Sequence, residues 1–182
     1  FNKKKIFRYL EKKNIFPSQI IKERFLFIPI IINDNGNDIS IFSNNPIYDN
    51  WNEVTKRYHL INYLLPSEDL EDLNLIKEKL DFLETYDFDD ITKKYFLKNS
   101  IISLIYIGNN ELRILTKIYN DKNVIIKNNS FKNLNIENDT DLNFLIINLK
   151  NLFEDTWKKL NEINTSIKVP ITIKIKNDDL KK

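Results

Sequence analysis

The chain of 182 residues contains no cysteine, no methionine and no alanine, and it has two glycines and one histidine. The absence of cysteine excludes disulfides, thiolate metal sites and a cysteine nucleophile. With His59 as the single histidine, multi-histidine metal sites are excluded, and we expect His59 to be a structural residue at a helix-to-strand junction. Phosphate-binding loops of the P-loop and dinucleotide types need several glycines. The chain has Gly36 and Gly108 alone, so both sequence motifs are excluded.

Neither sign of charge predominates, because the chain has 28 basic and 26 acidic residues, interspersed along its length. A nucleic-acid-binding protein normally concentrates positive charge on one face, whereas the basic runs here are as short as Lys3–Lys5. We therefore expect no nucleic-acid partner. No run of about 18 apolar residues is present, so we expect no membrane-spanning segment in this piece. Because methionine is missing, Phe1 is not a translation start, and we expect a fragment of a longer precursor.

Hydrophobic residues make up 42% of the chain and charged residues 30%, which is typical of a globular protein of one domain. We expect a single domain over 1–182, in which residues 1–22 are a leading helix and linker. Asn and Lys are used heavily, as AT-rich coding would produce. Clusters of these two residue types therefore carry less functional meaning here than in an average sequence.

Hydrophobic periodicity predicts an α/β fold. Helices are expected over 3–13, 48–58, 69–83, 88–97 and from 139 or 140 to 161, and strands over 24–32, 39–42, 60–65, 100–107, 111–119, 123–127 and 167–175. Alternation in the first half implies parallel crossovers, and the three consecutive strands in the middle imply an antiparallel meander. The expected sheet is therefore mixed, with helices packed on it. Pro29 and Pro170 argue for a strand edge or a bulge, because proline cannot donate to a ladder.

Acidic residues gather where two helices are expected to start. Ser67 or Asp69 stands at an N-cap position, and carboxylates in a first helical turn complement the positive end of the helix dipole. Capping explains these residues without a ligand. The alternative is a metal-dependent phosphodiester- or nucleotide-handling enzyme that uses Asp69, Asp72 and Asp89, which would require these carboxylates to converge in space.

Several short segments resemble the uncharacterised proteobacterial family called domain of unknown function 2066. The matching positions are Asn45, Pro46 and Trp51, then Pro66, Asp69, Leu70, Asp72 and Leu73, with Tyr95 and Trp157-Lys158 later. The chain departs from the family pattern at Ile47, Asn50, Glu68 and Phe96-Leu97. The resemblance implies a bacterial envelope protein with a signal peptide in its precursor, periplasmic or membrane-associated. The order of elements also looks like the amino-terminal domain of TolB and like outer-membrane lipoprotein activators of peptidoglycan synthases, which bind protein partners.

We therefore expect a non-enzymatic domain that binds another envelope protein, with no cofactor, no metal and no catalytic residue. Its expected binding residues are Asn45, Tyr48, Trp51, Ser67 and Asp69, because ligands usually sit beyond the carboxyl ends of parallel strands. The competing structural interpretation makes Asn45 a turn residue, Tyr48 and Trp51 packing residues, and Ser67 and Asp69 caps. A third interpretation, a small ligand in an α/β crevice, requires a deep pocket. The sequence leaves the oligomeric state open.

Overall fold

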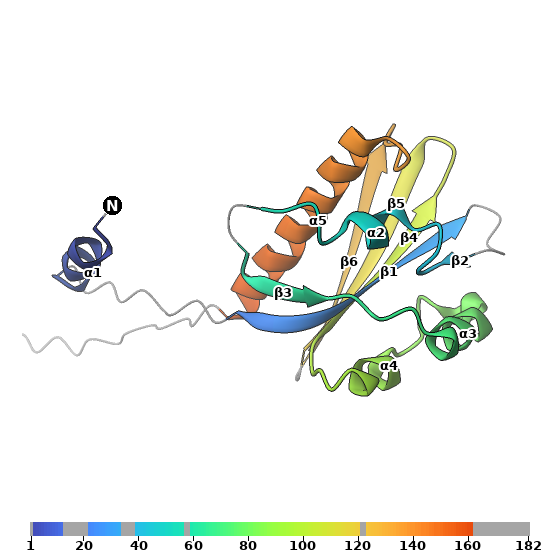
Figure 1. Cartoon of the computed structure of the whole chain (residues 1–182), viewed down its shortest axis with the longest axis horizontal. Coiled ribbons are helices and arrows are strands. Elements are labelled where there is room, and N and C mark those ends of the chain that lie inside the picture. Colours follow the sequence, from blue (N-terminus) through green and yellow to red (C-terminus); the bar gives the residue numbers. More distant parts are fainter. Residues whose placement is uncertain (1, 13–21, 34–38, 57–58, 121–122, 162–182) are drawn as a thin grey trace, which may run out of the picture.

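The computed structural model describes residues 2–12, 22–33, 39–56, 59–120 and 123–161 (Figure 1). The helices are α1 (Lys3–Lys12), α2 (Pro46–Asn50), α3 (Leu70–Glu78), the 3-10 helix η1 (Leu80–Phe82), α4 (Asp89–Lys94) and α5 (Asp139–Leu160). The strands are β1 (Glu23–Asn33), β2 (Ile39–Ser40), β3 (Ile61–Leu64), β4 (Ser100–Ile107), β5 (Glu111–Asn120) and β6 (Asn123–Lys132). One mixed sheet with helices packed on it confirms the predicted α/β class. The predicted strand over 167–175, with Pro170, lies outside the described residues.

β1 organises the sheet, because three other strands pair with it. On one side, β4 runs parallel to residues 26–33 of β1. On the other side, β3 pairs in parallel with residues 23–26, and β2 pairs antiparallel with Ile31 and Ile32. β5 and β6 follow β4 as antiparallel neighbours, which confirms the predicted meander.

Both faces of the sheet are covered at β1, as its continuous apolar run predicts. Phe25 and Phe27 point to the face covered by α2 and α5, whereas Leu26 and Ile28 point to the face covered by α3 and α4. Figure 1 shows α5 along one face and α3 and α4 against the other. Trp51 is fully buried on the α5 side, with its ring centroid 3.9 Å from that of Phe27. The indole therefore anchors the core beneath α2.

Pro29 lies in a stretch of β1 that has a strand on one side. It pairs with Ser103 of β4, but the pairing with β3 ends at Leu26 and the pairing with β2 begins at Ile31. The Pro29 carbonyl points into this gap and accepts a hydrogen bond from Asn45. Because the N–H and C=O of a strand residue face the same side, the missing N–H costs no ladder bond with β4. A local gap in a central strand thus accommodates the proline.

The predicted helix over 48–58 is wrong in its bounds. α2 begins at Pro46, with Asn45 as its N-cap, and ends at Asn50. Proline at the first helical position and asparagine at the cap both favour this earlier start. Val54 therefore lies beyond the helix instead of on its apolar face, and Tyr58 lies outside the described residues. The helix is short because the chain turns to bring Trp51 into the core.

Two further helices end earlier than predicted, and one strand is longer. The helix expected over 69–83 divides at Lys79 into α3 and η1, and α4 ends before Phe96, whose φ of 54° is left-handed. β6 continues five residues beyond the predicted end at 127. Its polar residues Asn128 and Ser130 are exposed, so they do not interrupt a strand that has one wet face.

Candidate binding crevice

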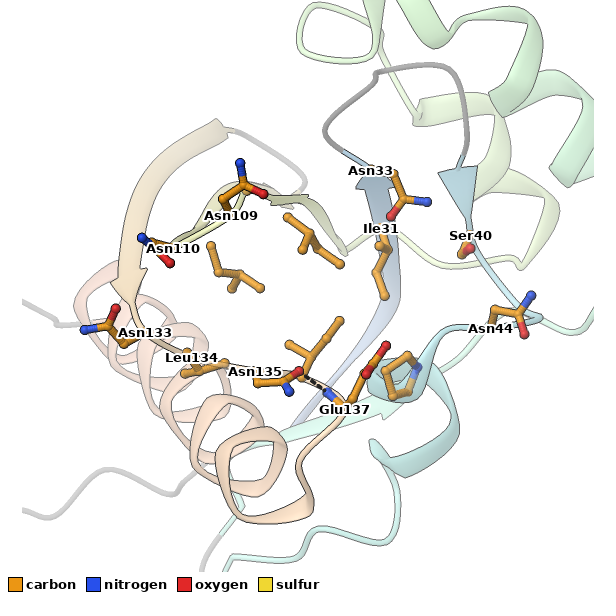
Figure 2. A pocket seen from close by; sticks show the side chains of 15 residues that line it. Ile31, Asn33, Ser40, Asn44, Asn109, Asn110, Asn133, Leu134, Asn135 and Glu137 are labelled. Atoms are coloured by element: carbon orange, nitrogen blue, oxygen red, sulfur yellow. Dashed lines mark hydrogen bonds between the residues drawn. The ribbon is translucent and has the colours of Figure 1, made fainter.

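A crevice opens beyond the carboxyl ends of the parallel strands β1 and β4 (Figure 2). Its volume of about 560 Å³ lies within the range of ligand sites. The walls come from the end of β1, the β4–β5 turn, the segment between β6 and α5, and the residues just before and at the start of α2. The location is the one at which open α/β sheets usually bind ligands.

The lining combines an apolar floor with a rim of side-chain amides. Ile31, Leu112 and Ile136 are almost fully buried beneath it. Six of the fifteen lining residues are asparagine, compared with 27 of 182 in the whole chain, so the enrichment exceeds the compositional bias. They are Asn33, Asn44, Asn109, Asn110, Asn133 and Asn135, and Figure 2 shows them around the opening. Glu137 is the one ionisable residue among the fifteen.

The β4–β5 turn forms one wall of the crevice. Asn109 and Asn110 are its two tip residues, and Gly108 N–H closes the hairpin by donating to the Glu111 carbonyl at 2.9 Å. Asn133 N–H donates to the Asn110 carbonyl at 3.0 Å, which ties the segment after β6 to the same turn. Asn133 has a φ of 56°, a conformation that asparagine tolerates better than most residues. These amides are therefore presented from fixed backbone.

The segment before α5 is held by local hydrogen bonds. Asn135 Oδ1 accepts from Glu137 N–H at 2.9 Å, drawn as the dashed line in Figure 2. Asn135 N–H in turn donates to Asp141 Oδ2 at 3.1 Å. Asn138 caps α5, because its Oδ1 accepts from Thr140 N–H and Asp141 N–H. This wall is consequently anchored on the longest helix of the fold.

Asn45 fixes the opposite wall, although its own side chain does not line the crevice. It is fully buried, and its Nδ2 lies within hydrogen-bonding distance of the carbonyls of Pro29 (2.9 Å), Ser40 (3.1 Å) and Ile41 (2.9 Å). Its Oδ1 accepts from Tyr48 N–H. The residues on either side, Asn44 and Pro46, are the ones that line the crevice. Asn45 is thus a positioning residue.

The other predicted binding residues lie apart from the crevice. Trp51 is buried in the core, and Tyr48 OH donates to the Pro66 carbonyl at 2.7 Å. Burial, with smaller contributions from nearby carboxylates, raises the pKa of Tyr48. Asp69 caps α3 by accepting from Glu71 N–H at 2.8 Å, and Ser67 lies two residues before it. The structure therefore does not gather the five predicted residues into one surface.

The acidic residues at the start of α3 surround a lysine. Lys94 Nζ forms an ion pair with Asp69 and another, at 3.0 Å, with Asp72, whose second oxygen accepts from Tyr95 OH at 3.0 Å. The hydrogen bond from Lys94 lowers the pKa of Asp69, and the hydrogen bonds to Asp69 and Asp72 raise the pKa of Lys94. The carboxylates converge on an ammonium group, so the proposed cation position is occupied by protein.

Asp89, the third residue of the metal hypothesis, pairs elsewhere. Its Oδ2 lies 3.2 Å from Lys93 Nζ, four residues along α4. Within the described ranges, no group of three or more histidine, cysteine, aspartate or glutamate side chains could hold a metal ion. Nothing among these residues therefore favours the metal-dependent enzyme.

A buried polar cluster beneath α2 was missed by sequence reasoning. Lys150 Nζ donates to the carbonyls of Trp51 at 2.6 Å and Val54 at 2.7 Å, and so holds the turn that follows α2. Burial lowers the pKa of Lys150 to about 8, although Glu154 opposes the shift. The available signal was the position of Lys150 and Glu154 beside Leu149 and Phe153 on the apolar stripe of α5.

The single histidine has a structural environment in the same cluster. His59 Nε2 accepts from Lys56 N–H at 3.1 Å, which leaves Nδ1 as the protonated nitrogen. That nitrogen faces Glu154 Oε1 at 3.7 Å, too far for a hydrogen bond, and Glu154 Oε2 pairs with Lys56 Nζ at 2.9 Å. His59 thus lies between the turn that follows α2 and β3, near Glu154 of α5, and not at the end of a helix as expected, because α2 already ends at Asn50.

Comparison with known proteins gives no match to a protein-family model, to a curated protein or to a solved structure. The resemblance to domain of unknown function 2066 and to the TolB amino-terminal domain therefore stays a prediction. Across the residues that the structure describes, no helix is both long enough and apolar enough to cross a membrane.

Proposed function

We propose that this domain binds another protein rather than catalysing a reaction, and that the amide-rimmed crevice receives an extended segment of that protein. The observation that carries the proposal is the crevice lining at the ends of β1 and β4. The proposal moves the binding surface predicted from the sequence to its immediate neighbours, Asn44 and Pro46.

A polypeptide matches both parts of the lining. An asparagine side chain carries a donor and an acceptor, as does each peptide group. Asn135 Oδ1 already accepts from Glu137 N–H, but the other rim amides can pair with a partner backbone in either direction. The apolar floor of Ile31, Leu112 and Ile136 can accept one aliphatic side chain of the same segment. An extended peptide presents backbone polar groups and apolar side chains in alternation.

A phosphate-bearing ligand matches the lining poorly. Phosphate recognition relies on Arg, Lys or a cluster of backbone N–H groups, whereas none of the fifteen lining residues is basic and Glu137 would repel an anion. The electrostatics thus support a neutral ligand over the nucleotide of the alternative hypothesis.

The envelope location belongs to the same proposal, and its support is the family resemblance. Cell fractionation of the source organism with an antibody against the domain tests it. Recovery in the periplasmic or membrane fraction is expected, and recovery with cytoplasmic markers would contradict it.

Site-specific photocrosslinking tests the binding site. A benzoylphenylalanine at Asn110, on the exposed crevice rim, should yield one defined protein adduct in cells. The matched control carries the same group at Lys77, an exposed residue of α3 on the opposite face of the sheet. Equal adducts from both positions would contradict a specific site, as would no adduct at Asn110.

A further inference from the structure

β6 leaves an open sheet edge in the described part of the chain. The strand order ends at β6, whose partner there is β5. Natural proteins usually protect such an edge with charged residues, proline or a bulge. β6 does carry Lys127 and Lys132, but its first half also exposes Val124 and Ile126, whose side chains are 55% and 59% exposed. Free backbone groups and apolar side chains therefore occur together.

The hydrogen-bond phase of the ladder identifies which residues face outward. Asn133 N–H donates to the Asn110 carbonyl, and this pair continues the register of β5 with β6. Since hydrogen-bonded and non-hydrogen-bonded pairs alternate in an antiparallel ladder, odd-numbered residues of β6 bond to β5. The even-numbered residues, among them Val124, Ile126 and Asn128, therefore direct their N–H and C=O groups away from the sheet.

We propose that two copies of this chain pair antiparallel through β6, about a two-fold axis at Ile126. In this register, Ile126 faces Ile126 of the second copy and Val124 faces Asn128. The outward N–H and C=O groups of both strands are then paired. The four exposed apolar side chains form one patch on the shared face, which an isologous dimer buries.

Neighbouring registers are less favourable. An axis one position further along places Lys127 opposite Lys127, and like charges directly opposite destabilise a sheet. An axis at Asn128 places Ile126 opposite Ser130 and Val124 opposite Lys132. Of these registers, only the one centred on Ile126 keeps the four apolar side chains adjacent and places no like charges opposite each other. It pairs seven described residues of each strand.

Cysteine crosslinking tests the proposal, because the chain contains no cysteine of its own. Ile126→Cys should form an intermolecular disulfide with copper phenanthroline, since residues at the axis have Cα atoms about 5.5 Å apart. Ser130→Cys is the matched control on the same strand, and its two copies lie roughly 26 Å apart in this register. Crosslinking of Ile126→Cys alone is expected.

Sedimentation equilibrium of the unmodified chain gives the second readout. A mass that rises toward a dimer with concentration is expected, and Ile126→Lys should be monomeric throughout. Its Tm should match that of the wild type at a dilution where the wild type is also monomeric, because this side chain is exposed in the monomer. A monomeric wild type would overturn the proposal, as would equal crosslinking of both cysteine variants. At that dilution, a lower Tm of Ile126→Lys would also overturn it, since the Ile126 side chain would then be buried within the monomer.

Discussion

The side-chain amide of Asn45 donates to the main-chain carbonyl of Pro29 at 2.9 Å, and this bond joins the α2 wall of the crevice to the middle of β1. Pro29 and Asn45 compensate for the same gap in the sheet. Pro29 lies where β1 lacks a strand on one side, and Asn45 supplies the donor that a neighbouring strand would have provided. Crevice geometry and sheet integrity therefore depend on the same side chain.

Replacing Asn45 should destabilise the domain strongly. Asn45→Ala removes the donor from three carbonyl groups at a fully buried position, so we expect the free energy of unfolding to fall by roughly 3 kcal/mol or more. Urea unfolding measures the change. Asn44→Asp, at the exposed neighbouring position, is the control and should change stability little.

Asn45→Asp adds a pH signature. A buried carboxylate facing three carbonyl oxygens has its folded-state pKa raised above the unfolded value, so this variant should lose stability as the pH rises through the folded pKa. It should regain part of that stability in acid, where the protonated group can donate. An Asn45→Asp variant as stable as wild type at pH 7 would contradict the assigned donor role.

Lys150 should give the wild type a distinct alkaline response. Its folded pKa of about 8 lies below its ordinary value of 10.5, so the unfolded chain binds the extra proton and stability rises with pH between these values. Relative to Lys150→Met, the wild type should gain up to roughly 3 kcal/mol across this range. Urea titrations of both proteins at pH 7, 8.5 and 10 measure it. If the difference in unfolding free energy between the two proteins does not change with pH, the lowered pKa of Lys150 is refuted.

Phe96 offers a stabilising substitution. Its φ is 54°, its side chain is 96% exposed, and its N–H donates to the Lys93 carbonyl while Leu97 N–H approaches the Thr92 carbonyl. This is the Schellman end of α4 with phenylalanine at the position that favours glycine. Phe96→Gly should raise the free energy of unfolding by about 1 kcal/mol.

Phe96→Ala separates the backbone effect from the loss of the ring. Alanine keeps the steric penalty of a left-handed residue, so this variant should match the wild type in Tm. Equal Tm values for the glycine and alanine variants would show that the backbone conformation carries no penalty.

Divalent cations should not stabilise the fold. Asp69 and Asp72 already share the Lys94 ammonium group, so millimolar Mg²⁺ or Ca²⁺ should leave the Tm unchanged. Lys94→Met should lower the Tm, because Asp72 is mostly buried and loses its partner. Lys93→Met is the matched control, since its partner Asp89 is exposed. Cation-dependent stabilisation of the wild type would revive the metal hypothesis.

The architecture was predictable because hydrophobic periodicity carries it. The unbroken apolar run of β1 indicates a strand covered on both faces, and the spacing of Leu142, Leu145, Leu149 and Phe153 indicates α5. The first and last residues of a helix were less predictable where a single local interaction decides them. Capping by Asn45 moved the start of α2, and a left-handed Phe96 ended α4.

The crevice was not predictable, because its residues come from four separate segments. Asn109 and Asn110 read as a turn, Asn135 as a loop residue and Asn44 as part of a polar run, and no sequence spacing connects them. Only the parallel pairing of β1 with β4 brings their ends together. The expectation that ligands bind near the ends of these strands points to the same region as the crevice, but it named Asn45 and Trp51, which are buried beneath the surface.

The most direct measurement is the yield of the Asn110 photoadduct after the crevice is filled. Asn33→Trp adds a large side chain at an exposed lining residue, and Lys77→Trp adds the same volume elsewhere. We predict that Asn33→Trp abolishes the adduct and Lys77→Trp leaves it unchanged, with both variants folded by circular dichroism. An adduct that persists in Asn33→Trp would contradict binding in the crevice.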